Sequence, residues 1–431
     1  MLARSIDDIA VAVRIARRHG RPFVARGSGT GLCGGATPLD DAVLIVTSRM
    51  DRVLEVDPVE RIAWVEPGVL NRDLSTAVAH LGLHYAPDPS SQQACSIGGN
   101  VGTNAGGPHC LAEGVTSGHV VAIDVVTPEG EIERFGGLVP DQPGLDLRGA
   151  FVGSEGTLGI AGRIAVRLLP NPPEIATLLC DFDTVDAATA TVSGIIAAGI
   201  VPAAIEMMDQ RITVAVEDFV AAGYPRDAAA VLLIEVDGLA GGVAAQAAAI
   251  EAVALERGAR TVRRAADATQ RDLLWKGRKT AFGAVARIAP DYYLHDAVVP
   301  RTRLGEILRE VYRIGEEQRV TIVNVFHAGD GNLHPIISFD AREPGIWERV
   351  HAAGDAIVRA CVAAGGTLSG EHGIGLEKRD AMPLIFSADD LDFQARLGDA
   401  FDPEGLANPG KVLPQGSRCG EARNVPEGVW V

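Results

Sequence analysis

The chain has 431 residues, with 39 Lys and Arg against 56 Asp and Glu, which gives a formal net charge of -17 and a pI of about 5.0. This length predicts about two or three domains, and the 47% hydrophobic and 22% charged residues exclude disordered and disulfide-scaffold proteins. The strong negative charge disfavours nucleic acid or anionic lipid as the main partner, so an anionic substrate needs local positive groups.

The cellular compartment is predicted from cysteine usage and apolar stretches. The six cysteines are scattered singly and show no C-x-x-C spacing, which favours free thiols in a reducing compartment. They are Cys33, Cys95, Cys110, Cys180, Cys361 and Cys419. No apolar stretch reaches the roughly 18 to 20 residues of a membrane span, and a polar helix stands where a signal peptide would lie. We therefore expect a cytoplasmic protein.

The first part of the chain reads as a mixed helix and strand domain. Ser5 begins a helix whose apolar face includes Ile9 and Val13, and Gly20 ends it. Further elements follow in chain order. They are strand 22–25, strands 43–47 and 62–65, helix 71–81, a hairpin around 128–130 and a run at 164–169. The stiff segment 170–173, which contains three prolines, predicts a domain boundary.

The second part alternates strands and helices in the order of a βαββαβ layer, which predicts a ferredoxin-like α+β fold. Its expected elements are strand 176–182, helix 185–198, strand 201–207, strand 231–236, helix 242–257 and strand 260–264. Helices at 270–286, 303–318 and 347–364 and a pair of strands around 329–332 come next. The tail beyond Pro414 is polar, and we expect it to be loosely held.

Glycine is abundant, with 50 residues, and it is concentrated in four clusters where we expect close approach of the backbone. These clusters lie at 27–35, 98–107, 153–159 and 370–375. The first contains a Gly29-x-Gly31-x-x-Gly34 pattern, yet only seven residues, including Pro38, separate it from the next strand. That is too short for a Rossmann crossover helix, and the Lys-Ser/Thr of a Walker loop is missing.

A nest of backbone N–H groups preceded by Arg26 remains as the interpretation, and it is suited to a pyrophosphate. A glycine-rich hairpin without a ligand is the alternative for this cluster alone. The second cluster, with Asn100, Thr103 and Asn104 among small residues, repeats the pattern. Two such loops in one domain favour a bound dinucleotide.

A candidate metal site lies late in the chain. Asp330-Gly331 is a turn signal between two apolar runs, so His327 and His334 should stand opposite one another and present both rings on one face. Glu371 and His372 follow inside a glycine frame. Two histidines and a carboxylate form a first-row transition-metal set, and His372 is then available as a base. A purely structural histidine pair is the alternative.

A cationic clamp for an anionic substrate is predicted at Trp275-Lys276-Gly277-Arg278-Lys279. On a helix, Arg278 could hold a carboxylate through two parallel hydrogen bonds. A solvated basic patch is the competing interpretation of the same residues.

With these residues in view, the sequence resembles the FAD-linked oxidases of the vanillyl-alcohol oxidase and p-cresol methylhydroxylase superfamily, and within it the glycolate oxidase and D-lactate dehydrogenase branch. The resemblance covers nearly the whole chain and rests on seven motifs in order. They are 26–31, 87–91, 96–100, 153–160, the His327/His334 hairpin, 369–375 and 408–411.

The resemblance implies an α+β fold: a FAD-binding domain of the p-cresol methylhydroxylase type at 1–172, a ferredoxin-like substrate (cap) domain with the metal site at 173–390, and a segment at 391–431 that closes over the flavin. It further implies a set of FAD-binding residues. They are Arg26, Gly27, Ser28, Gly29, Thr30, Gly31, Pro87, Asp88, Cys95, Ser96, Gly98, Gly99, Asn100, Thr103, Asn104, Gly106, Glu155, Gly156, Gly159, Ile160, Asn408 and Lys411. The first loop lacks the histidine that bonds flavin in covalent members, so non-covalent FAD is expected.

The resemblance also implies a reaction. His327, His334 and Glu371 would ligate a divalent metal (zinc, manganese or iron), and the metal and Arg278 would fix the hydroxyl and carboxylate of a small 2-hydroxy acid. His372 would take the hydroxyl proton while hydride leaves Cα for flavin N5 and a 2-oxo acid forms. Glycolate or D-lactate is expected, because Leu294 and Ile336 stand where a lysine and an asparagine bind the second carboxylate in the 2-hydroxyglutarate branch.

Partners and alternatives complete the expectations. The glycolate oxidase system implies an iron–sulfur subunit and a second FAD-binding subunit as electron acceptors, and through them a peripheral place at the inner membrane. Relatives begin with a further helix and strand, which predicts a truncated or misassigned N-terminus. Three alternatives stay open: a D-2-hydroxyglutarate-type dehydrogenase, a flavin-free metal hydrolase, and a non-catalytic FAD-binding assembly subunit.

Overall fold

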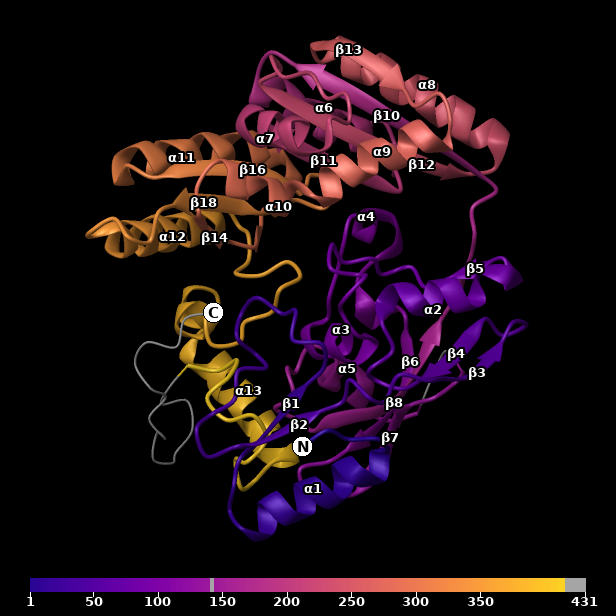
Figure 1. Cartoon of the computed structure of the whole chain (residues 1–431), viewed down its shortest axis with the longest axis vertical. Helices are drawn as coiled ribbons and strands as arrows, with labels where there is room; N and C mark the ends of the chain where they lie inside the picture. The colour runs from indigo at the N-terminus through magenta and orange to yellow at the C-terminus, as the bar shows by residue number, and fades with distance from the viewer. Residues whose placement is uncertain (140–142, 415–431) are drawn as a thin grey trace. The chain divides into compact units, whose positions relative to one another are not determined.

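The structure, a computed structural model, describes residues 1–139 and 143–414. The chain divides into two compact units, which are described separately (Figure 1). Unit 1 contains Met1–Gly107, Glu113–Asn171 and the chain from Glu371 onward, and unit 2 contains Pro108–Ala112 and Pro172–Gly370. The tail beyond Pro414, together with Cys419, lies outside the described residues.

Unit 1 is built around a five-stranded antiparallel sheet with strand order β3-β4-β8-β6-β7, and it also contains a parallel pair, β1-β2, and a short pair, β5-β9. Its strands are β1 (Phe23–Arg26), β2 (Val43–Val46), β3 (Val53–Asp57), β4 (Ile62–Val65), β5 (Leu83–His84), β6 (Val120–Val126), β7 (Ile132–Gly136), β8 (Ile160–Arg167) and β9 (Leu169–Pro170). Its helices are α1 (Ile6–Arg18), α2 (Asn71–Val78), α3 (Ile97–Thr103), α5 (Leu147–Phe151) and α13 (Ala388–Phe401), with the 3-10 turns η1 (Ala79–Leu81), η2 (Thr116–Gly118) and η5 (Arg379–Leu384).

Helix α1 begins and ends where the sequence predicts. The Ser5 hydroxyl accepts a hydrogen bond from the backbone N–H of Asp8 at 3.1 Å, which caps the helix, and Gly20 follows its end with a left-handed φ of 57°. Ile9 and Val13 are fully buried against the sheet. The amphipathic pattern therefore fixes which face of α1 is packed.

The first glycine cluster connects two strands that pair in parallel, β1 and β2. None of the connecting residues 27–42 is helical, so the prediction that a Rossmann helix is missing is confirmed. The parallel pairing itself was not predicted. The glycine loop makes the whole crossover, and Gly29 takes a φ of 75° that other residues rarely adopt.

The second glycine cluster corrects the prediction of a loop, because Ile97–Thr103 forms helix α3. Ser96 caps it by accepting a hydrogen bond from the backbone N–H of Gly99 at 3.3 Å. A Cβ at Gly98 would lie 2.5 Å from Pro67 Cβ, so close packing requires this glycine in spite of its low helix propensity. The backbone at Gly98 does make a close contact, as the glycine density predicts, but the contact is with Pro67 of the same unit.

Unit 2 contains a nine-stranded antiparallel sheet, and helices of 4 to 18 residues pack on it among its described residues. The strands are β10 (Glu174–Phe182), β11 (Ala204–Asp209), β12 (Ala230–Gly238), β13 (Ala259–Arg264), β14 (Asp291–Leu294), β15 (Ala297–Val298), β16 (Thr321–His327), β17 (Asn332–Leu333) and β18 (Pro335–Phe339). The helices are α6 (Val185–Ala197), α7 (Gln210–Val220), α8 (Ala240–Glu256), α9 (Ala268–Lys279), α10 (Ala281–Ala284), α11 (Leu304–Gln318) and α12 (Ile346–Ala363); η3 (Val285–Arg287), η4 (Arg301–Arg303) and α4 (Cys110–Glu113) are short.

The order β13-β10-β12-β11 confirms the predicted ferredoxin-like layer. Helix α7, between β11 and β12, is an addition that the sequence did not predict. The sheet continues beyond β11, which pairs with β16, and β16 in turn pairs with β17 and β18. Figure 1 shows α11 and α12 beside this extension.

The two faces of the unit 2 sheet are covered by different helices. Apolar residues of α6, α8, α11 and α12 cover one face, and those of α7, α9 and α10 cover the other. Side chains alternate along a strand, so Met207 faces the first group while Met208 faces the second. By the same alternation Glu206 and His327 are directed to the face that carries α9.

Within the two described stretches of the chain, every helix is too short or too polar to span a bilayer.

Candidate functional site

The predicted FAD-binding loops of unit 1 lie together. A Cβ on Gly27 would clash with the Ser96 hydroxyl, so the first and second glycine clusters are in backbone contact. A Cβ on Gly35 would clash with the Glu155 carboxylate, which joins the first cluster to the third. Segments more than 100 residues apart in sequence are therefore assembled into one surface.

Glu155 connects this surface to the fourth cluster. Its Oε1 accepts hydrogen bonds from the backbone N–H groups of Ile374, at 2.7 Å, and Gly375, at 3.0 Å, and a Cβ on Gly373 would lie 2.7 Å from the same oxygen. Burial raises the pKa of Glu155, and the two backbone hydrogen bonds oppose that shift. The carboxylate is thus directed to segment 373–375, which the sequence did not predict.

Asn408 and Lys411 return from the C-terminal segment to the same loops. The Asn408 Nδ2 donates to the carbonyl oxygens of Gly35, at 2.8 Å, and Glu155, at 2.6 Å. Lys411 Nζ donates to the Thr37 carbonyl at 2.7 Å and to Asn408 Oδ1 at 3.2 Å. Burial lowers the pKa of Lys411 to about 8, while the charge of Glu155 opposes the shift.

Other predicted FAD residues occupy defined positions around these loops. The Arg26 guanidinium lies against Gly29, Thr103 Oγ1 donates to the Gly99 carbonyl at 3.4 Å, and Asn104 Oδ1 accepts from Ser117 N–H at 2.8 Å. The Pro87 carbonyl accepts a hydrogen bond from Asn71 Nδ2 at 2.8 Å. Gly156 and Gly159 both have positive φ angles. Cys95 is buried, and Ile160 begins β8.

Two buried polar atoms in these loops fit a polar ligand. Asn100 Nδ2 and Ser154 Oγ are buried and have no hydrogen-bond partner in the part of the chain that the structure describes. Buried polar groups in native proteins are nearly always satisfied, so such atoms point to a bound group. A Cβ at Gly31 or Gly102 would meet nothing within 4 Å, which leaves open space beside the loops.

His327 and His334 approach each other in unit 2, although their register differs from the prediction. His327 pairs with Asn332 and Asn324 pairs with Pro335, so His334 falls between β17 and β18 instead of opposite His327. The two ring centroids are nevertheless 5.1 Å apart with the planes at 86°. Both imidazoles are buried.

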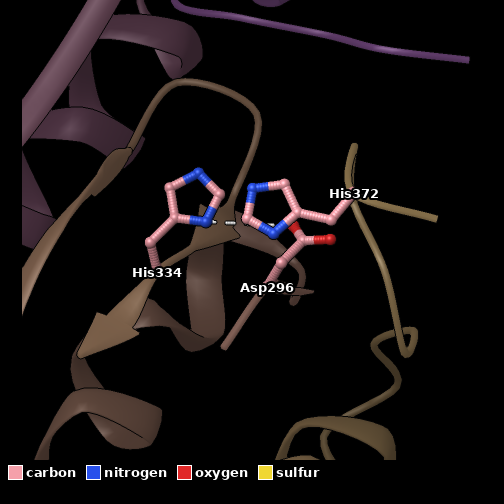
Figure 2. A group of neighbouring side chains, drawn as sticks. All are labelled: Asp296, His334 and His372. Atoms are coloured by element: carbon pink, nitrogen blue, oxygen red, sulfur yellow. Dashed lines mark ion pairs between the residues drawn. The ribbon is translucent and has the colours of Figure 1, made fainter. Parts of the chain in front are cut away.

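Glu371 and His372 directly follow Gly370, the last residue of unit 2, where Asp296 fixes the chain. The Asp296 carboxylate accepts from the Gly370 N–H at 3.0 and 3.1 Å and from the Ser369 hydroxyl at 2.7 Å. Ligand atoms of His327, His334 and Glu371 lie within 4.8 Å of one another. A second group, Asp296, His334 and His372, meets the same limit, and Figure 2 shows these three side chains directed toward one another.

These two groups share His334, and together they offer imidazole nitrogens and carboxylate oxygens in a largely buried setting. That donor set suits a first-row divalent metal more than calcium or magnesium. Asp296 was not predicted from the sequence. The available signal was its place beside His295 in a short stretch between two apolar runs.

Glu206 is a further residue that sequence reasoning missed. It is 1% exposed on β11, and its register partner is His327. His327 Nδ1 lies 2.8 and 3.0 Å from the two Glu206 oxygens, and Arg278 Nη2 lies 2.5 Å from Oε2. A lone glutamate inside the apolar run 203–208 was the signal for it.

Arg278 is also buried, and it is paired with Glu206 instead of lying open as a solvated patch. Its Nη2 lies 2.5 Å from Glu206 Oε2, and among the described residues its Nε has no hydrogen-bond acceptor. These two nitrogens form the edge of a guanidinium that binds carboxylates side-on. The solvated-patch interpretation is therefore wrong for Arg278, and its role as a clamp for a substrate carboxylate stays a prediction.

A loop surface suited to FAD, and a ferredoxin-like unit that carries buried histidines and carboxylates, are the features of a FAD-dependent oxidoreductase. Comparison with known families agrees: residues 1–136 match the FAD binding domain, and residues 171–412 match the C-terminal domain of FAD linked oxidases. The chain belongs to the FAD linked oxidases.

The relatives narrow this class. The chain is 47% identical over 421 residues to the glycolate oxidase subunit GlcD of Escherichia coli K12, covering 98% of this chain and 84% of that protein. It is 30% identical to a D-lactate dehydrogenase of Anaerostipes hadrus, covering 95% of this chain and 83% of the relative. The solved structure of p-cresol methylhydroxylase shares the fold, with a TM-score of 0.80 at 15% identity over 96% of this chain and 88% of that one.

Proposed function

We propose that this chain oxidises a small 2-hydroxy monocarboxylate, glycolate or D-lactate, to the 2-oxo acid. The observation that carries the proposal is the buried Arg278. Its Nε has no hydrogen-bond partner among the described residues, and its ion-pair partner Glu206 also contacts His327 of the metal-donor set. A buried cation with an unused donor is suited to an anionic substrate. The names of the relatives, a glycolate oxidase subunit and a D-lactate dehydrogenase, support the same class.

The residues divide the chemistry between them. Arg278 holds the substrate carboxylate, and His327, His334 and Glu371 are placed to hold a divalent zinc, manganese or iron ion. When bound, FAD supplies the hydride acceptor and the cation a Lewis acid that lowers the pKa of a coordinated hydroxyl. His372 takes the hydroxyl proton as hydride leaves Cα, and ligand atoms of Asp296 and His334 lie within 4.8 Å of its ring nitrogen.

The size of the substrate is proposed from a cross-strand pair. Leu294 on β14 is the register partner of Ile336 on β18, and both pack in the apolar cluster on the face that carries α9. Neither side chain can pair with a second carboxylate. This favours a monocarboxylate over the 2-hydroxyglutarate alternative.

The remaining parts of the proposal are cofactor attachment, partners and location. Non-covalent FAD is supported by the first loop, which has Leu32 and Cys33 but no histidine. Iron–sulfur and second FAD-binding subunits are proposed as electron acceptors, since the Escherichia coli relative is named a subunit. If these partners are correct, the protein is cytoplasmic and is held at the inner membrane through them. The match to a FAD binding domain removes the flavin-free hydrolase.

The test is an anaerobic visible spectrum of the FAD-reconstituted protein before and after glycolate, D-lactate, L-lactate or D-2-hydroxyglutarate, with and without a chelator. Bleaching by glycolate or D-lactate that the chelator prevents supports the proposal. Bleaching by D-2-hydroxyglutarate alone favours the dicarboxylate reading. A protein that holds FAD and is bleached by none of these acids is the assembly subunit.

A further inference from the structure

The strand β11 carries a buried carboxylate that touches two parts of the site at once. Glu206 lies opposite His327 in the sheet, and it contacts the imidazole of His327 and the guanidinium of Arg278. Both Glu206 and Arg278 are 1% exposed. A buried ion pair is weak evidence for a gain in stability, because desolvation of both charges offsets their attraction. Its position therefore calls for another explanation.

The contact with His327 sets the state of that ring. An ionised carboxylate only accepts hydrogen bonds, so the proton of neutral His327 lies on Nδ1, 2.8 Å from Glu206 Oε1. The lone pair is then on Nε2, the nitrogen on the other side of the ring. A metal-binding histidine commonly has such a carboxylate behind it, which fixes both tautomer and orientation.

The contact with Arg278 is made by Oε2, which also lies 3.0 Å from His327 Nδ1. Glu206 Oε2 balances the guanidinium charge at Nη2, at 2.5 Å, while the neighbouring Nε has no hydrogen-bond partner among the described residues. The cation can therefore remain buried before any anion arrives.

We propose that Glu206 is a positioning residue that orients His327 for a metal and holds Arg278 ready for a carboxylate. The inference rests on the proposed metal site. It deepens that proposal by assigning two tasks to one residue of the sheet: Glu206 sets which nitrogen of His327 faces the metal, and it balances the charge of the buried Arg278 guanidinium.

The experiment measures Mn²⁺ affinity by titration calorimetry on the chelator-stripped, FAD-loaded protein. Glu206→Gln alone would leave Arg278 as an uncompensated buried cation, so the working variant is the double change Glu206→Gln with Arg278→Met. Arg278→Met alone separates the loss of the cation. Glu235→Gln is the matched control, because Glu235 is a buried glutamate on the neighbouring strand β12 that binds Thr177 and Trp275.

The double variant should weaken Mn²⁺ binding about 10- to 100-fold, the usual effect of removing such a partner. Its near-UV circular dichroism should match the wild type, and Glu235→Gln should bind Mn²⁺ as tightly as the wild type does. The double variant should also bind Mn²⁺ more weakly than Arg278→Met alone, which keeps Glu206 behind His327. In ¹⁵N-histidine spectra, His327 should lose its preference for the Nδ1–H tautomer only when Glu206 is replaced.

Wild-type Mn²⁺ affinity in a folded double variant would overturn the role of Glu206 and leave the metal site standing. If Glu235→Gln weakened Mn²⁺ binding equally, the specific role of Glu206 would also be overturned, because loss of any buried carboxylate would then be enough to weaken the metal site. A wild-type protein that binds neither Mn²⁺ nor Zn²⁺ would overturn the metal site itself and the role of Glu206 with it.

Discussion

Asn408 gives the sharpest prediction for unit 1, because one side chain holds three segments together. It is 1% exposed, its Nδ2 donates to the Gly35 and Glu155 carbonyls at 2.8 and 2.6 Å, and its Oδ1 accepts from Lys411. Asn408→Ala leaves one buried and one partly buried carbonyl without a donor. At about 1–3 kcal/mol each, the unfolding free energy should fall by about 2–6 kcal/mol. The left-handed φ of 41° adds to the loss, since alanine tolerates it less well than asparagine.

Urea unfolding of the FAD-loaded protein measures this loss, and flavin fluorescence measures the expected weakening of FAD binding. Asn71→Ala is the matched control: Asn71 is equally buried, but its Nδ2 makes one such bond, to the Pro87 carbonyl at 2.8 Å. It should cost about half as much. A loss for Asn408→Ala no larger than that for Asn71→Ala would refute the reasoning.

Three further predictions follow from the site. His372→Ala should abolish hydroxy-acid turnover while FAD stays bound; loss of FAD as well would make the residue structural. His334→Ala should release metal from a folded protein, and unchanged metal content by elemental analysis would contradict the assignment. Burial lowers the pKa of Lys411 from 10.5 unfolded to about 8 folded, so between these values the unfolded chain binds more protons and stability rises with pH. Lys411→Met should remove this pH-dependent increase in unfolding free energy, which is at most about 3 kcal/mol. Urea unfolding at pH 8 and pH 10 measures it, and an increase in the variant as large as that in the wild type would contradict the prediction.

The fold could be predicted where local patterns and topology agree. The alternation of strands and helices at 176–264 specified the ferredoxin-like order, and Ser5 and Gly20 specified the limits of α1. Helices α3 and α7 were missed because three glycines and several β-branched residues hide their helical signal. In both cases the capping residue was present in the sequence, Ser96 for α3 and Asp209 for α7.

The candidate site could be predicted only in part for a different reason. His327, His334 and Glu371 could be proposed because a turn joins the two histidines and a glycine frame surrounds Glu371, and their role as metal ligands stays a prediction. Glu206 is 121 residues from His327, and the pairing of β11 with β16 alone brings them into contact. No local pattern encodes that register, so the carboxylate behind the histidine appeared only with the sheet.

The glycine clusters illustrate why ligand arguments from sequence need the structure. The density of glycines predicted that the backbone closely approaches a ligand or other atoms, and many of those atoms belong to the protein itself. Gly98 faces Pro67, and Gly35 and Gly373 face the Glu155 carboxylate. Glycine content therefore reports how tightly the loops are assembled. The evidence for a ligand in unit 1 comes instead from Asn100 and Ser154, whose buried polar atoms have no acceptor or donor within residues 1–139 and 143–414.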